Sequence, residues 1–69
     1  MNKVELLKNV LNSSQGNMFS VEISTTKENE KEIQELIREL ETEKRIKLRE
    51  YREKENSIYI HGIIKYASD

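Results

Sequence analysis

The apolar residues of this chain change their spacing partway along it, from a helical period to alternation. Between residues 33 and 40 they recur at i, i+3, i+4 and i+7, which marks one face of an amphipathic helix. The residues on this face are Ile33, Leu36, Ile37 and Leu40. From residue 46 onward apolar and polar residues largely alternate, as they do along half-buried strands. The pattern therefore predicts an α+β fold, in which a helix and strands share one core.

The helix that carries this face is predicted to span residues 26–45. Thr25 with Glu28 fits a capping box at its start, and Thr26 offers an alternative N-cap. Lys44 and the cation after it suit the negative end of the helix dipole. We expect the four apolar residues of this helix to form the centre of the core. Their expected partners there are Leu7, Val21, Leu48 and Ile60.

A shorter helix and a strand are predicted before it. The helix spans residues 2–13, and Gly16 lies just beyond its end, free to take a positive φ. The apolar stripe of this helix consists of Val4, Leu7 and Leu11, widened by Leu6 and Val10. Residues 18–24 then alternate as a half-buried strand, although a single helical turn from Ser20 is the other interpretation of so short a segment.

The C-terminal part of the chain is predicted to form a β-hairpin from residues 46–52 and 57–66. Placing Leu48 opposite Ile60 brings the apolar residues of both strands to one face. This register leaves a three-residue loop at residues 53–55. The predicted order of elements is therefore helix, strand, helix, strand, strand, within a single domain that spans the whole chain.

The small size of the chain bears on how it reaches stability. A domain of 69 residues is near the lower limit of what folds unaided, and it has no cysteine for a disulfide or a thiolate metal site. Self-association is the remaining source of stability. The last strand is apolar on both faces around Ile63 and Ile64, with Tyr59 nearby, and one thin sheet cannot cover both faces. We therefore expect a homodimer.

The element order resembles that of a winged-helix DNA-binding domain, in which a helix and a short strand precede a helix-turn-helix and a two-stranded wing. The matching segments are the helix at 3–12, the strand around 19–23 and the stretch at 25–48. The last stretch looks like a recognition helix that runs into the first wing strand, and the wing would be 46–66. The family normally has a separate second helix, for which only residues 20–26 are available here. The resemblance implies double-stranded DNA as the partner.

Charge is unevenly distributed along the chain. The net charge of −1 is weak support for a nucleic-acid partner, because Lys and Arg contacts to phosphate dominate such affinity. Residues 27–43, however, contain seven glutamates against three cations, a net of −4. Residues 44–54 contain six cations against two glutamates, a net of +4. The positive part of the chain therefore falls on the first strand of the predicted hairpin.

The long helix is sorted by charge as well. At about 100° per residue its cations and one glutamine fall on one flank of the exposed face, hereafter the basic flank, which carries Lys27, Lys31, Gln34, Arg38 and Arg45. The other flank, hereafter the acidic flank, carries Glu28, Glu32, Glu35, Glu39 and Glu43. On DNA the lysines would contact phosphates, and Gln34 and Arg38 would contact base edges. A solvated helix laced with ion pairs is the other interpretation. The candidate nucleic-acid-binding residues are Lys27, Lys31, Gln34, Arg38, Arg45, Lys47, Arg49, Arg52 and Lys54.

Catalysis and metal binding find little support in the sequence. In the predicted register Tyr51 and Tyr59 lie on the hairpin face opposite the apolar set, where they would either stack a base or pack on each other. His61 is the sole histidine and no cysteine is present, which does not fit a zinc site. No nucleophile elbow or glycine-rich phosphate loop occurs. We expect a protein that is not an enzyme and takes no cofactor or metal.

Two functional hypotheses follow. The first is a small, non-catalytic DNA-binding regulator of transcription of winged-helix type. The second is a small phage- or plasmid-type protein that binds a host protein through the acidic flank and modulates its activity. The first requires that Arg38 and the cations of residues 44–54 share one face. The sequence has no signal peptide and no run of the roughly 18 apolar residues that a membrane span needs, so we expect a cytoplasmic protein.

Overall fold

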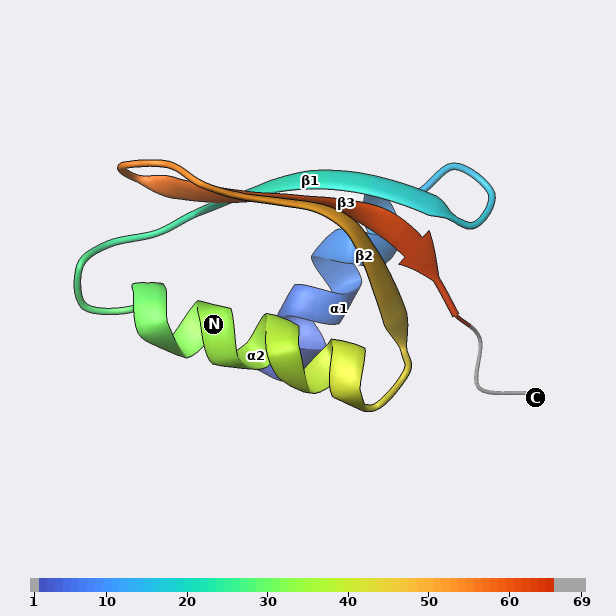
Figure 1. The fold of residues 1–69 in the computed structure, drawn as a ribbon, viewed down its shortest axis with the longest axis horizontal. Helices are drawn as coiled ribbons and strands as arrows, with labels where there is room; N and C mark the ends of the chain where they lie inside the picture. The colour runs from blue at the N-terminus through green and yellow to red at the C-terminus, as the bar shows by residue number, and fades with distance from the viewer. Residues whose placement is uncertain (1, 66–69) are drawn as a thin grey trace.

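A three-stranded antiparallel sheet with both helices on one of its faces forms this protein (Figure 1). The computed structural model describes residues 2–65. The elements are α1 (Lys3–Asn12), β1 (Met18–Ser24), α2 (Glu30–Thr42), β2 (Ile46–Glu53) and β3 (Ser57–Ile64). β3 lies in the middle of the sheet, between β1 and β2. The predicted α+β class, the element order and the C-terminal hairpin are confirmed.

α1 and β1 lie close to their predicted positions. The side chain of Asn2 caps α1 by accepting a hydrogen bond from the Glu5 N–H at 2.9 Å. β1 spans residues 18–24, so the alternative of a helical turn is wrong. Gly16 takes a φ of 64°. It does so inside a tight turn, where Gln15 and Met18 exchange backbone hydrogen bonds of 2.8 and 3.2 Å, and not at the end of α1.

α2 begins later than the predicted residue 26. The Thr26 N–H donates to Asn29 Oδ1 at 2.7 Å and the Asn29 N–H donates to Thr26 Oγ1 at 3.2 Å. These local bonds hold the chain in a turn that leads into the helix, because the Glu30 N–H donates to the Thr26 carbonyl at 2.9 Å. The helix itself starts at Glu30 with Asn29 as its N-cap, so the alternative N-cap Thr26 is also wrong. Thr25 does not cap the helix, because it is buried and its Oγ1 has no hydrogen-bond partner among the described residues. The predicted capping box with Glu28 is therefore wrong.

α2 also ends before the predicted residue 45, at a backbone reversal centred on Lys44. Lys44 has a φ of 62°, the left-handed region that glycine usually occupies. The Arg45 N–H donates to the Leu40 carbonyl at 2.9 Å, and the Lys44 N–H donates to the Glu41 carbonyl at 3.0 Å. This pair of bonds is the Schellman motif, which terminates the helix. No glycine announced it in the sequence.

No helix separates β1 from α2. The residues between Ser24 and Glu30 form only the turn at Thr26. The arrangement is therefore loosely winged-helix-like in element order and in its C-terminal hairpin, while the separate second helix of that family is missing from it.

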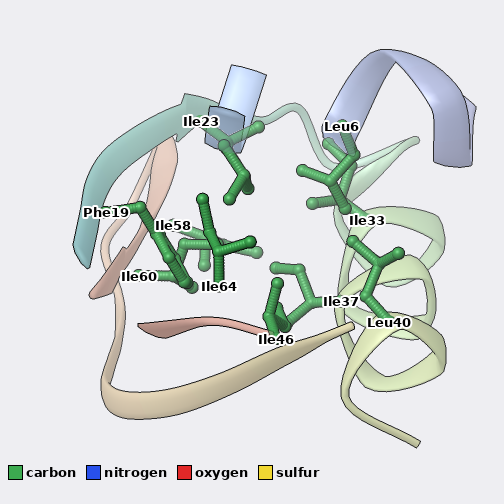
Figure 2. Packing of buried hydrophobic residues seen from close by; sticks show 11 residues of the cluster. Leu6, Phe19, Ile23, Ile33, Ile37, Leu40, Ile46, Ile58, Ile60 and Ile64 are labelled. Atoms are coloured by element: carbon green, nitrogen blue, oxygen red, sulfur yellow. The ribbon is translucent and has the colours of Figure 1, made fainter. Parts of the chain in front are cut away.

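The core lies between the helices and the sheet (Figure 2). Its buried residues are Leu6, Val10, Phe19, Ile23, Ile33, Ile37, Leu40, Ile46, Ile58, Ile60 and Ile64. In Figure 2 the side chains of the two helices point toward those of the sheet. The predicted centre was therefore right for Ile33, Ile37, Leu40 and Ile60. Leu36, Val21 and Leu48 are only partly buried against this cluster, and Leu7 lies outside it.

α1 is rotated relative to the prediction. Leu6 and Val10, which were expected only to widen its apolar stripe, are fully buried. Val4 and Leu11, which were expected to face the core, are 64% and 41% exposed. The apolar arc of α1 is wider than the surface that the sheet and α2 cover, so one side of the arc faces solvent.

β2 contains a β-bulge that the sequence interpretation missed. The register moves from Leu48 opposite Gly62 to Glu50 opposite His61, so Arg49 is the extra residue. The predicted pairing of Leu48 with Ile60 is therefore wrong. Gly62 makes the bulge feasible, because a Cβ there would lie 2.1 Å from the Lys47 carbonyl oxygen.

The bulge also changes the turn and the ends of the hairpin. Beyond it β2 continues to Glu53, which pairs with Ile58, and the Lys54 N–H donates to the Ser57 carbonyl at 2.8 Å. The loop between the strands therefore has the predicted three residues but lies at 54–56, one position later than the predicted 53–55. β3 ends at Ile64, and the predicted strand end at Tyr66 lies outside the described residues.

The burial of the residues of α2 predicts how much each substitution by alanine destabilises the protein. Ile37 is 2% exposed, and Ile37→Ala should lower the free energy of unfolding by about 2–5 kcal/mol. Leu36→Ala should lower it less, because Leu36 already contacts water. Urea unfolding followed by circular dichroism measures both. Equal losses would show that α2 is rotated from the position described.

The bulge predicts different costs for alanine at the two glycines. Gly62→Ala should destabilise strongly, by roughly 1–3 kcal/mol or more, because the new methyl would overlap backbone atoms of β2. Gly16→Ala meets open space and should cost only the strain of its positive φ, about 1–2 kcal/mol. Thermal unfolding of both variants tests this, and a Gly62→Ala protein as stable as wild type would exclude the close approach of β3 to β2 at Gly62.

Candidate nucleic-acid interface

The nine candidate nucleic-acid-binding residues lie on two neighbouring parts of the molecule. Lys27 lies in the turn before α2, and Lys31, Gln34 and Arg38 follow on α2 itself. The remaining five, Arg45, Lys47, Arg49, Arg52 and Lys54, run from the loop before β2 through β2 to the hairpin turn. All nine are exposed to solvent except Gln34, which is half-buried.

One hydrogen-bonded cluster orients the basic flank of α2. Gln34 Nε2 donates to Glu53 Oε2 at 2.7 Å, and the same oxygen accepts from Tyr51 Oη at 2.9 Å. The flank that carries Gln34 and Arg38 therefore faces β2. The amide of Gln34 is engaged with a protein carboxylate, so contact with a base edge would require that bond to break.

The bulge explains why Tyr51 and Glu53 face the helix. An extra residue inverts the alternation of a strand, so Tyr51 pairs with Ile60 and shares its helix-facing side. Tyr59 lies on the opposite, open face of the sheet, where its Oη is 2.6 Å from Ser20 Oγ. The prediction that Tyr51 and Tyr59 share one face is wrong, and they neither pack on each other nor form one platform for a base.

A hollow of about 270 Å³ separates α2 from β2 beside this cluster. It is lined by Gln34, Ile37, Arg38, Glu41, Leu48, Tyr51 and Glu53. Burial raises the pKa of the Tyr51 phenol to about 12, and the hydrogen bond to Glu53 and the charge of that carboxylate act in the same direction. The positive charge of Arg38 acts in the opposite direction on the pKa of Tyr51.

Ion pairs divide the candidate cations into two groups. Arg45 pairs with Glu43 at 3.0 Å, Lys54 pairs with Glu22 at 3.5 Å, and Arg52 pairs with Glu50. Within residues 2–65 no ion pair involves the other five cations, which are Lys27, Lys31, Arg38, Lys47 and Arg49. Exposed pairs of this kind contribute only about 0–1 kcal/mol, so a phosphate can displace them.

The cations of α2 and those of β2 do not share one face, which the DNA-binding hypothesis was expected to require, but the two groups meet at one edge of the molecule. Lys47 pairs with Ile63 and Arg52 with Tyr59, so both side chains belong to the open face of the sheet. The basic flank of α2 faces the other side of β2. Because β2 is an edge strand, both groups border the same rim.

The acidic flank of α2 faces α1. Lys3 Nζ lies 2.5 Å from Glu43 Oε2 and 3.1 Å from Glu39 Oε1. The hydrogen bond from Lys3 and its charge hold the pKa of Glu43 below its usual value. Two contacts therefore orient α2: Gln34 with Glu53 turns the basic flank toward β2, and Lys3 with Glu39 and Glu43 turns the acidic flank toward α1.

His61 has a structural contact on the open face. It is half-buried, and its Nδ1 lies 2.9 Å from the Phe19 carbonyl oxygen, to which the ring donates when that nitrogen carries the proton. Across residues 2–65 no group of three histidine or carboxylate side chains is arranged to hold a metal ion. In the same part of the chain no helix is long and apolar enough to cross a membrane.

Sequence reasoning missed Glu53 and Tyr51 as partners of the basic flank. Their orientation follows from the bulge, and the signal for it was Gly62, since an isolated glycine inside a strand often marks a bulge or a close backbone approach.

The Tyr51 cluster predicts how stability depends on alkaline pH. An unfolded tyrosine loses its proton near pH 10, whereas folded Tyr51 keeps its proton until about pH 12. The contribution of protonated Tyr51 to the free energy of unfolding is therefore full below pH 10 and is lost as the pH rises toward 12. Tyr51→Phe should make the decline in the free energy of unfolding shallower over this range. Urea unfolding of both proteins at a series of pH values measures it, and parallel declines would contradict the cluster.

Comparison of the chain with protein-family models, with curated proteins and with solved structures finds no match. The functional inference therefore rests on the fold, the charges and the contacts described above.

Proposed function

We propose that this chain is a small, non-catalytic, cytoplasmic regulator that binds double-stranded DNA in the manner of a winged-helix domain. The observation that carries the proposal is the position of α2. Its exposed flank with Lys31 and Arg38 adjoins β2, the edge strand of the hairpin that bears Lys47 and Arg49. A helix and a neighbouring basic hairpin can contact the major groove and the adjacent backbone together.

Arg38 is the residue best suited to contact a base. It is exposed, it has no ion pair among the described residues, and a guanidinium can donate two parallel hydrogen bonds to guanine. Gln34 is less suited, because its amide is bound to Glu53. Lys31, Lys47 and Arg49 would instead contact phosphates, which positions the protein without reading sequence.

The acidic flank supports an orientation on DNA. It lies on the side of α2 that faces α1, so phosphates would repel it and favour approach from the β2 side. A low net charge is then compatible with DNA binding, because only one rim of the molecule has to be basic.

A second function is favoured by a separate observation. Glu35, Arg38, Glu39, Thr42 and Glu43 line a shallow hollow of about 420 Å³ on the outer face of α2. Three carboxylates in one hollow suit a basic side chain, which would bind Glu35 and compete with Lys3 for Glu39 and Glu43. In this alternative the chain is a small phage- or plasmid-type protein that binds a basic surface of a host protein and modulates its activity.

DNA binding is tested by fluorescence anisotropy with a random-sequence duplex at low and at high salt. Wild type should bind at low salt and weaken as salt rises. Changing both Lys47 and Arg49 to Ala should weaken binding to every sequence and reduce the salt slope by about 2, one per lost phosphate contact. Arg38→Ala should cost roughly 1–3 kcal/mol at a selected site and reduce the preference for it.

Glu35→Gln is the matched control on the opposite flank of the same helix. It should leave binding unchanged or tighten it, because it removes a negative charge from the hollow that Glu35 shares with Arg38 without removing a group that donates to DNA. An absence of duplex binding by wild type even at low salt would refute the regulator proposal and leave the basic protein partner as the alternative.

A further inference from the structure

α1 carries two adjacent rows of apolar residues, and only one of them is buried in the core. Leu6 and Val10 are fully buried in the core. Val4, Leu7 and Leu11 follow at i, i+3 and i+7 on a neighbouring line, hereafter the α1 stripe. Val4 is 64% exposed and Leu11 is 41% exposed, while Leu7 between them is partly buried. Val4, Leu11 and Met18 are the exposed large aliphatic residues among those that the structure describes.

One border of the α1 stripe adjoins the carboxylates of α2, and the other border carries an exposed cation. Lys3 lies one turn before Leu7, and its bonds to Glu39 and Glu43 turn this side of α1 toward the acidic flank of α2. Lys8 lies on the other border, one turn from both Val4 and Leu11. It is exposed and has no ion pair among residues 2–65.

We propose that two copies of this chain pair through the α1 stripe, with the two α1 helices parallel about a twofold axis. The spacing i, i+3, i+7 is that of the seam between two helices packed side by side. Parallel pairing places Lys8 of each copy next to the acidic flank of the other, near Glu35. Antiparallel pairing would instead bring the two acidic flanks together, which charge repulsion disfavours.

This interface differs from the one that the sequence suggested on the last strand. Ile64 is 4% exposed and faces the protein's own core, so it is not available to a second copy. Ile63 and Tyr59 on the open face are each partly buried by their neighbours. The α1 stripe, which the sequence assigned to the core, carries the more exposed side chains.

Sedimentation equilibrium without DNA tests the pairing, so its outcome is independent of the proposed function. Wild type at micromolar concentration should have twice the 8.2 kDa mass of one chain. Leu11→Glu should give the mass of one chain with an unchanged circular dichroism spectrum, because the side chain is exposed in the monomer. Met18→Glu is the matched control, because the side chain of Met18 is 49% exposed and lies on the sheet, away from α1. This change should leave the dimer intact. A monomeric wild type, or a dimer that Leu11→Glu preserves, would overturn the proposal.

The absence of cysteine from the chain allows a second test by disulfide cross-linking. Leu11→Cys should cross-link to itself under mild oxidation several-fold faster than Met18→Cys. When Val4→Cys and Leu11→Cys proteins are mixed, homodisulfides should predominate. Predominance of the mixed disulfide would show antiparallel helices and overturn the arrangement.

Discussion

The close approach of β3 to β2 at Gly62 determines much of what surrounds it. A side chain at this position would collide with the Lys47 carbonyl, so the two backbones can meet there only because the residue is glycine. The bulge at Arg49 directly adjoins this close approach, and it inverts the alternation of the remainder of β2. Tyr51 and Glu53 then face the helices, where Glu53 accepts hydrogen bonds from both Gln34 and Tyr51 and so connects β2 to α2.

The candidate interface depends on this contact as well. Without the bulge Tyr51 and Glu53 would point to the open face, and no side chain of the outer half of β2 would bind the basic flank of α2. With it, the flank that carries Arg38 adjoins the strand that carries Lys47 and Arg49. A second contact, from Lys3 to Glu39 and Glu43, fixes the other flank against α1. Two charged contacts of modest energy therefore select which side of α2 can meet a partner.

Several residues of the chain occupy positions where proteins usually have a different residue type. Lys44 takes a left-handed conformation where glycine is preferred, and Thr25 buries a hydroxyl without a hydrogen-bond partner among the described residues. α1 leaves Val4 and Leu11 in solvent. The first two are local costs of connecting elements by short loops. The third is the surface through which we propose that two copies of the chain pair.

The kind and order of the elements followed from the sequence, because helical period and strand alternation are local properties of neighbouring residues. The same patterns identified Ile33, Ile37 and Leu40 as core and grouped the cations of the candidate interface. The rotation of α1, the register of the hairpin and the face of Tyr51 did not follow. Each depends on contacts between segments far apart in the chain, such as Lys3 with Glu43 and Gly62 with Lys47. These contacts form only once the sheet and the helices have packed together.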